Sequence, residues 1–180
     1  MASNWVWDSR PTLTIWVYDS ARGAAAGEVR LRDLARRGAV SVVDAVTVTW
    51  VRGTHRPRAG RSRGWTRHEV AREGVLARLA ELLVGPEEGP GGPARLSSLL
   101  TGTGVDEVLL DEVVRELVPD SSALLVLSTD VDLDVVRPIV ERGRARGDVV
   151  VLHAYLTPGG IDLMRAALGS PPGGGGRLLD

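Results

Sequence analysis

The sequence predicts an α/β (α+β) protein with a ferredoxin-like arrangement, in which two strand–helix–strand units build a four-stranded antiparallel sheet with both helices on one face. Two observations predict this fold class. Valine-rich segments typical of strands alternate with segments whose apolar residues recur at helical spacing. The order also occurs twice, because GAVSVVDA starting at Gly38 and GDVVVLHA starting at Gly147 share their glycine, two valines and the closing alanine. The chain is therefore expected to contain a βαβ–βαβ pseudo-repeat.

The first unit begins with TLTIWVYD, Thr12–Asp19, which is β-branched and aromatic and ends at a Ser/Asp turn, so a strand is predicted. A helix is predicted over Ala21–Arg37, with Gly38 well placed as its C-cap residue. The valine-rich segment Ala39–Val51 predicts a long second strand. The residues near helical spacing in the predicted helix are Ala25, Val29, Leu31, Leu34 and Ala35.

The second unit repeats this plan. Ser122–Ser128 predicts an apolar strand, and Asp132 can cap the helix LDVVRPIVERGRAR. Gly147 then precedes a strand predicted over Asp148–Thr157. Pro138 lies inside the predicted helix, where a kink or a break is expected.

The two units are separated by an insertion of about residues 52–118. It contains an arginine-rich stretch, an amphipathic helix predicted over Thr66–Val84, a Gly/Pro loop and the predicted helix VDEVLLDEVVRELV. The predicted helix Thr66–Val84 can pack against one of three partners. These are the sheet of its own chain, another subunit, or a membrane surface with Arg67, Arg72 and Arg78 near the lipid headgroups. Its apolar side consists of Val75, Leu76, Leu79, Leu82 and Leu83.

The arginine-rich stretch Arg52–Arg72 carries seven arginines, two histidines and one acid, although the whole chain has a net charge of −1. Guanidinium groups and Trp65 suit phosphates and base stacking, whereas the alternation in RPRAGRSRGW equally suits an exposed edge strand protected by its charges. Three interpretations are open: a solvated hairpin, contact with an acidic partner, and binding of nucleic acid or anionic lipid. The candidate interaction or anion-binding residues are Arg56, Arg58, Arg61, Arg63, Trp65 and Arg67.

An acidic partner is present in the chain itself. Between Asp106 and Asp134 there are nine acids and a single base, Arg115. Two regions of opposite charge can be steered together, or can align neighbouring subunits head to tail. The candidate acidic partner surface consists of Asp106, Asp111, Glu112 and Glu116.

Composition narrows the possible functions. The 180 residues suit one domain, expected over residues 12–169, with an N-terminal extension at 1–11 and a flexible Gly/Pro tail at 170–180. The absence of cysteine excludes disulfides, thiolate nucleophiles, iron–sulfur clusters and Cys-type zinc sites. Every basic residue is Arg, a bias typical of GC-rich genomes that weakens the case for nucleic acid. No leader or spanning segment is recognisable, so a soluble, cytoplasmic bacterial protein is expected.

No residue is predicted to be catalytic, metal-binding or cofactor-binding. DVDLD, Asp130–Asp134, has alternating carboxylates but lacks the glycine and final Glu of a calcium loop, so a turn and helix cap is the preferred interpretation. No serine lies in a Gly-x-Ser-x-Gly elbow. His153 occupies the position of Asp44 in the repeat, and a hydrogen bond between them is possible if their strands are central neighbours.

The order of these segments resembles a bacterial family. LTIWVYDSARGAAAGEVRLRDLARRGAVSVVDAVTVTW, the basic hairpin after it, and GVDEVLLDEVVRELVPDSSALLVLSTDVD are similar to domain of unknown function 1269. The related family 6325 shares the SSALLVL-like strand, and the likeness covers most of Leu13 to about Leu168. Members of the first family carry a glycine-rich hydrophobic hairpin and are described as membrane proteins. This chain has Thr66–Val84 and the loop Gly85–Pro93 there instead, so the resemblance implies a fold, without a membrane property or catalytic residues.

The sequence therefore predicts a non-enzymatic protein that acts through protein contacts, as a self-associating structural or regulatory module with itself or another protein as partner. The alternative is an anion-binding module whose Arg52–Arg72 stretch holds nucleic acid or lipid headgroups. No cofactor is expected.

Overall fold

The computed structural model describes residues 9–61, 74–85 and 92–169. Its strands are β1 (Thr12–Tyr18), β2 (Ser41–Thr49), β3 (Arg58–Arg61), β4 (Ser122–Thr129) and β5 (Val149–Tyr155). Its helices are α1 (Gly23–Arg36), α2 (Val75–Leu83), α3 (Pro93–Leu99), α4 (Glu107–Glu116), α5 (Leu133–Arg146) and α6 (Gly160–Gly169).

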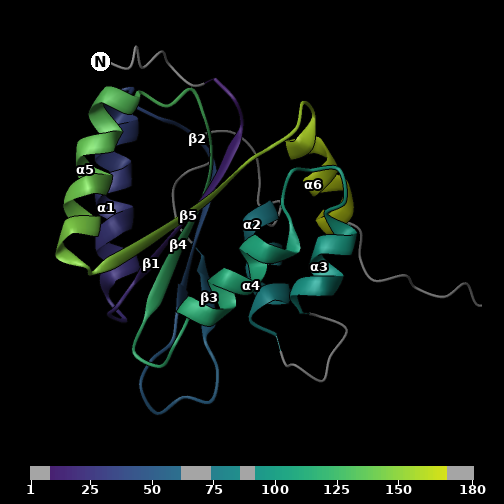
Figure 1. The fold of residues 1–180 in the computed structure, drawn as a ribbon, viewed down its shortest axis with the longest axis horizontal. Helices are drawn as coiled ribbons and strands as arrows, with labels where there is room; N and C mark the ends of the chain where they lie inside the picture. The colour runs from purple at the N-terminus through teal and green to yellow at the C-terminus, as the bar shows by residue number, and fades with distance from the viewer. Residues whose placement is uncertain (1–8, 62–73, 86–91, 170–180) are drawn as a thin grey trace, which may run out of the picture.

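All described strands belong to one antiparallel sheet with the order β3-β2-β4-β1-β5 (Figure 1). The predicted α+β class is confirmed. The predicted number of four strands is wrong for the described residues, because Arg58–Arg61 pairs with Val46–Thr49 of β2 and adds a fifth strand. This short, arginine-containing strand lies at the edge of the sheet, as the alternation in RPRAGRSRGW suggested.

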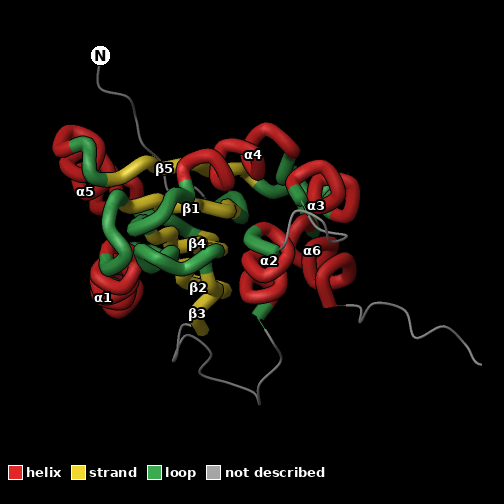
Figure 2. The backbone as a smooth tube through the Cα atoms, turned by 90° about the horizontal axis from the view of Figure 1, so that it is seen from below, coloured by secondary structure: helices red, strands yellow, loops and turns green. Residues whose placement is uncertain are grey.

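Helices cover both faces of the sheet (Figure 2). α1 and α5 lie on one face, and α2, α3, α4 and α6 lie together beside the other. Alternation along β1 divides its side chains accordingly: Leu13, Ile15 and Val17 belong to the core under α2 and α4, whereas Trp16 and Tyr18 face α1 and α5.

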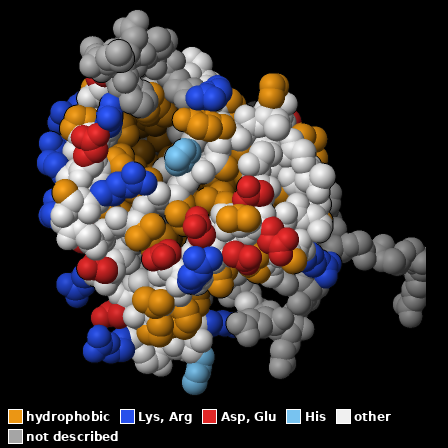
Figure 3. Space-filling model, viewed as in Figure 1, with side chains coloured by type: hydrophobic (Ala, Val, Ile, Leu, Met, Phe, Trp, Pro, Cys, Tyr) orange, Lys and Arg blue, Asp and Glu red, His pale blue; other side chains and the backbone are white. Residues whose placement is uncertain are grey.

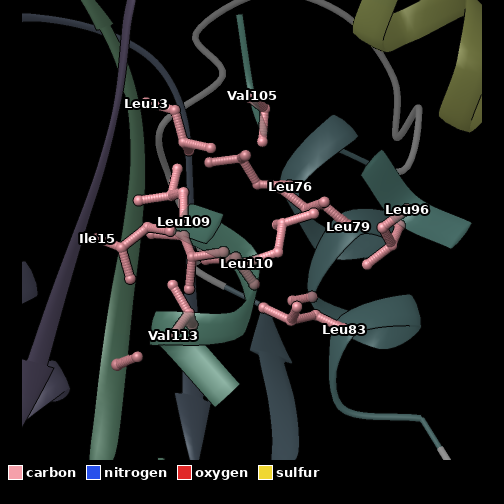
Figure 4. Packing of buried hydrophobic residues seen from close by; sticks show 14 of the residues in the cluster. Leu13, Ile15, Leu76, Leu79, Leu83, Leu96, Val105, Leu109, Leu110 and Val113 are labelled. Carbon is pink, nitrogen blue, oxygen red and sulfur yellow. The ribbon is translucent and has the colours of Figure 1, made fainter. Parts of the chain in front are cut away.

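The main core lies between the sheet and the four-helix side (Figure 4). Figure 4 shows leucines from α2 and α4 pointing toward Leu13 and Ile15 of β1. The apolar side predicted for Thr66–Val84 is confirmed in its described part, since Leu76, Leu79 and Leu83 are buried and α2 packs on its own sheet. The opposite side has a much smaller cluster of buried residues, formed by Ala24, Leu124 and Val126.

Local signals explain where two helices begin and end. The Asp106 carboxylate accepts a hydrogen bond from Leu109 N (2.9 Å) at the start of α4, and Asp132 caps α5 in the same way. Gly147 ends α5 in the left-handed region. The predicted helix continues through Pro138, so it is not broken there. Proline has no N–H to donate to the backbone carbonyl one turn earlier, but Pro138 is exposed, so water can bond that carbonyl instead.

The start of α1 is capped from a distant strand. Its N-cap residue, Arg22, makes no side-chain cap hydrogen bond. Ser122 Oγ, on the buried end of β4, accepts from Ala24 N at 2.9 Å and donates to Ser20 O at 2.6 Å. The hydroxyl therefore satisfies a first-turn N–H and fastens α1 to the centre of the sheet.

The start of α2 is capped in the same manner. Gly74 has no side chain, and Asp44 Oδ2 from β2 accepts a hydrogen bond from Leu76 N at 2.9 Å. A Cβ at Gly74 would lie 2.7 Å from both carboxylate oxygens, so the close approach requires glycine. The pKa of Asp44 is raised by burial, which outweighs the hydrogen bonds from Leu76 N and Ala45 N.

The apolar residues at helical spacing in α1 do not all face the sheet. Val29 is 65% exposed and Ala25 is exposed. α1 instead meets the sheet through Ala24 and Gly27, because the Tyr18 ring lies against the glycine and leaves no space for a larger side chain.

Two helices, α3 and α6, have no predicted counterpart. Both are short, and each buries only a few apolar side chains against neighbouring helices, such as Leu96 in α3 and Met164 in α6. Within the described ranges, no helix is long and apolar enough to cross a membrane.

Candidate functional site

The described part of the arginine-rich stretch consists of an exposed loop after β2 and of β3, and we call Arg52–Arg58, which ends on the first residue of β3, the basic loop. Arg56 and Arg58 are exposed and form no ion pair with any residue that the structure describes. Arg61 belongs to β3, where it pairs with Val46. The remaining candidates, which lie outside the described residues, are Arg63, Trp65 and Arg67.

Hydrogen bonds hold the first half of the basic loop in place. Trp50 Nε1 donates to Thr54 O at 3.0 Å, and Thr54 Oγ1 donates to Val51 O at 2.7 Å. Asp120 fixes the same corner, because its N–H donates to Trp50 O (2.8 Å) and its carboxylate pairs with the Arg52 guanidinium at 3.3 Å. One contact between the predicted basic and acidic regions is therefore made within the chain.

The acidic candidates lie on α4 or at its start. Asp106 and Asp111 are exposed, whereas Glu112 and Glu116 are half-buried. Figure 3 shows acidic side chains gathered near the middle of this side of the molecule, with hydrophobic side chains between them. We call this surface the acidic face; its carboxylates belong to Asp106, Glu107, Asp111, Glu112 and Glu116.

Exposed valines interrupt the acidic face. Val108 is 67% exposed, and Val114 and Val118 are exposed as well. The surface thus combines apolar side chains with carboxylates that have no cationic partner among the described residues.

The proposed hydrogen bond between Asp44 and His153 is wrong. β2 and β5 are separated by β4 and β1 in the sheet, so the two strands are not neighbours. Asp44 instead caps α2, and the exposed His153 ring packs edge-on against Tyr155 (centroids 5.4 Å apart), over which the Arg10 guanidinium lies at 3.8 Å. Matching positions in a sequence repeat become adjacent only if the topology pairs their strands.

The turn-and-cap interpretation of DVDLD is confirmed. Asp130 adopts a left-handed conformation (φ 49°) and Asp132 caps α5. Among the described residues, no three His, Asp or Glu side chains are grouped as metal ligands would be.

The structure also contains a groove that the sequence analysis did not anticipate. We call it the α1–α5 groove; its volume is about 600 Å³, its floor is formed by Trp16, Tyr18 and Leu124, and its walls by α1 and α5. A weak signal was available in the sequence, because a helix that meets a sheet through alanine and glycine, as α1 does, buries little apolar side-chain volume above that sheet. The charged residues that line this groove are Asp19, Arg30, Asp33, Arg37, Arg142, Arg146 and Asp148.

Comparison with known proteins adds no family to this description. No family model, curated protein or solved structure matches the chain. The resemblance to domain of unknown function 1269 therefore stays a prediction.

Proposed function

We propose that this protein is a non-enzymatic module that acts through protein contacts and associates with copies of itself, the basic loop of one copy binding the acidic face of the next. The observation that carries this proposal is the separation of opposite charges into two exposed surfaces. Within the described residues, neither Arg56 and Arg58 on one surface nor Glu107 and Asp111 on the other form ion pairs.

The composition of the two surfaces supports a contact between copies. Complementary charges steer encounter and fix the register of an interface, while apolar area such as that of Val108 contributes to its affinity. The basic loop is ordered by its own hydrogen bonds, so binding requires little additional ordering. The two surfaces differ from each other, so the association is head to tail.

The Arg52–Asp120 pair supports the chemistry of this contact. It joins the same two regions inside one chain, although both side chains are exposed and the pair by itself adds little stability. Several such pairs around an apolar centre are needed for a specific interface, and α4 offers carboxylates on both sides of Val108.

Sedimentation velocity at two salt concentrations tests the proposal. In about 10 mM salt, where the Debye length is about 30 Å, we expect species larger than the 19.2 kDa monomer. In about 1 M salt, where charges are screened within about 3 Å, we expect monomer. Reversing the loop charges with Arg56→Glu and Arg58→Glu should give monomer at both concentrations, and so should Glu107→Arg with Asp111→Arg on the acidic face.

Mixing the two charge-reversed proteins is the decisive experiment. The acidic loop of one variant then faces the basic α4 surface of the other, so association should return. The matched control, Arg22→Glu with Arg95→Glu, reverses two exposed arginines elsewhere and should behave as wild type. A wild-type monomer in both salts would overturn the proposal. So would loss of association in the control, or salt-dependent binding of a labelled oligonucleotide by a protein that stays monomeric.

We also propose that β1-α1-β2 and β4-α5-β5 form a ferredoxin-like βαβ–βαβ pseudo-repeat to which β3 is added at the edge. The order β2-β4-β1-β5 and the position of α1 and α5 on one face support this layout.

A further inference from the structure

The α1–α5 groove arises because two helices cover one face of the sheet without filling the space between them. Within the described ranges, the buried cluster on this face consists of Ala24, Leu124 and Val126, in contrast to the large core on the other side. Figure 2 shows α1 and α5 as two separate helices on the same side of the sheet. The groove volume of about 600 Å³ lies within the range of roughly 300–1,000 Å³ that is typical of small-molecule sites.

The walls combine small residues with arginine. Gly27 and Arg30 are one turn apart on α1, and Arg142 and Gly143 line the groove from α5. Gly27 lets the Tyr18 ring lie close to α1, and Gly143 packs against Val149, while the aromatic side chains of the floor belong to Trp16 and Tyr18 of β1.

Several polar groups around the groove have no partner. Asp148 Oδ1 is buried without a hydrogen bond, while Oδ2 accepts from Arg146 Nε at 2.9 Å. Arg30 and Arg142 form no ion pair, and the Tyr18 hydroxyl forms no hydrogen bond, with any residue that the structure describes. Arg30 and Arg142 are exposed, and Asp148 Oδ1 is the buried side-chain oxygen of the described residues that lacks a hydrogen bond. Buried polar atoms in proteins are nearly always paired, so this oxygen beside the groove indicates a place where a ligand or a water binds.

The charges of these groups indicate the chemistry of that molecule. Arginine guanidinium groups bind carboxylates and phosphates through paired, charge-assisted hydrogen bonds. The pKa of Tyr18 is raised, chiefly by burial, so its hydroxyl stays protonated at neutral pH and remains a hydrogen-bond donor.

We propose that the α1–α5 groove binds a small organic anion, a carboxylate or phosphate monoester with an apolar body. The body packs on Trp16 and Tyr18, Arg30 and Arg142 bind the anionic group, and Asp148 Oδ1 accepts a hydrogen bond from the ligand or from a water beside it.

Tryptophan indole N–H signals in ¹⁵N NMR spectra test this proposal on the full chain. Of the five tryptophans, Trp16 lies in the groove and Trp50 donates to Thr54 O in the basic loop. Their signals are assigned with Trp16→Phe and Trp50→Phe. The probes are naphthoate, naphthyl phosphate and octanoate, with neutral naphthalenemethanol as the uncharged control. Saturable shifts are expected at Trp16 with the anions, without a shift at Trp50.

Variants separate anion recognition from general hydrophobic binding. Arg30→Gln with Arg142→Gln should weaken naphthoate and naphthyl phosphate binding at least about tenfold, the loss expected for charge-assisted hydrogen bonds. The control Arg95→Gln with Arg115→Gln removes two exposed arginines of the opposite helical layer and should leave affinity within about twofold. Far-ultraviolet circular dichroism checks that the variants are folded.

The relative affinities of the probes identify the ligand. Preference for naphthoate or octanoate indicates a carboxylate, and preference for naphthyl phosphate indicates a phosphate monoester. The proposal is overturned if none of the anions shifts the Trp16 signal, if naphthalenemethanol binds as tightly as naphthoate, or if Arg30→Gln with Arg142→Gln leaves affinity unchanged. Arg30 and Arg142 lie apart from the basic loop and the acidic face. Their substitution should therefore leave the salt-dependent association unchanged, so the two proposals are tested separately.

Discussion

Substitution of Asp44 tests whether helices in this fold depend on caps supplied by distant strands. In Asp44→Ala, Leu76 N loses the carboxylate oxygen that lies 2.9 Å away, and the first turn of α2 keeps an unsatisfied donor beside a buried leucine. Among the residues that the structure describes, no other side chain caps this helix, and Gly74 at its N-cap has none to offer.

The expected cost follows from this one hydrogen bond. Loss of an N-cap acceptor costs about 0.5–2 kcal/mol. The upper half of that range, about 1–2 kcal/mol, applies here because Asp44 also accepts from Ala45 N at 2.9 Å. A change of 1 kcal/mol shifts Tm by about 2–4 °C in a domain of this size, so Tm should fall by about 2–8 °C.

The pH dependence gives a second and sharper signature. Burial raises the folded-state pKa of Asp44 above its ordinary value of 3.8, so the folded protein binds this proton more tightly than the unfolded chain does. The associated stability is fully present below the unfolded-state pKa and is lost as the pH rises through the folded-state pKa. The cost of Asp44→Ala should therefore be larger near pH 4 than at pH 7.

Urea unfolding monitored by tryptophan fluorescence between about pH 4 and pH 7 measures both effects. The control Asp111→Ala removes an exposed carboxylate from α4 and should change the free energy of unfolding by less than about 0.5 kcal/mol. A cost of Asp44→Ala that shrinks on acidification would refute the reasoning, because it would mean that the carboxylate is stabilised in its charged form. A cost near zero at all pH values would show that α2 does not need this cap.

Two further predictions concern buried side chains. Ser122→Ala should lower the free energy of unfolding by about 1–2 kcal/mol, because the buried Ala24 N–H loses its acceptor; the exposed Ser98→Ala should have almost no effect in the same urea titration. Leu110→Ala should cost about 2–5 kcal/mol because its side chain is fully buried in the main core, whereas Val108→Ala on the same helix should change stability by less than about 0.5 kcal/mol in thermal unfolding. Equal effects of Leu110→Ala and Val108→Ala would contradict the assigned packing of α4.

The predicted elements with strong local signals occur close to their expected positions. β1 and β4 were recognisable from β-branched or apolar runs, and α5 from the cap Asp132 and the terminal Gly147. α3 and α6 were missed because packing against other helices determines them more than their own capping residues do. The exposure of Val29 was also missed, because it depends on how closely Tyr18 holds α1 to the sheet.

The candidate surfaces were predictable only as charge patterns. The sequence showed that basic and acidic regions exist, and the Arg52–Asp120 pair joins them at one point. The α1–α5 groove could not be derived, because its floor and walls come from segments that are far apart in the chain.

The sequence by itself determined what depends on neighbours along the chain: the alternation of strands and helices, the caps Asp106 and Asp132, and the turn at Asp130. The tertiary structure decided what depends on strand order. Asp44 and His153 occupy equivalent repeat positions, yet β4 and β1 lie between their strands. The same strand order brings Ser122 to α1, 98 residues from the N–H that it caps, because hydrogen bonds between distant segments form only after the sheet has fixed their separation.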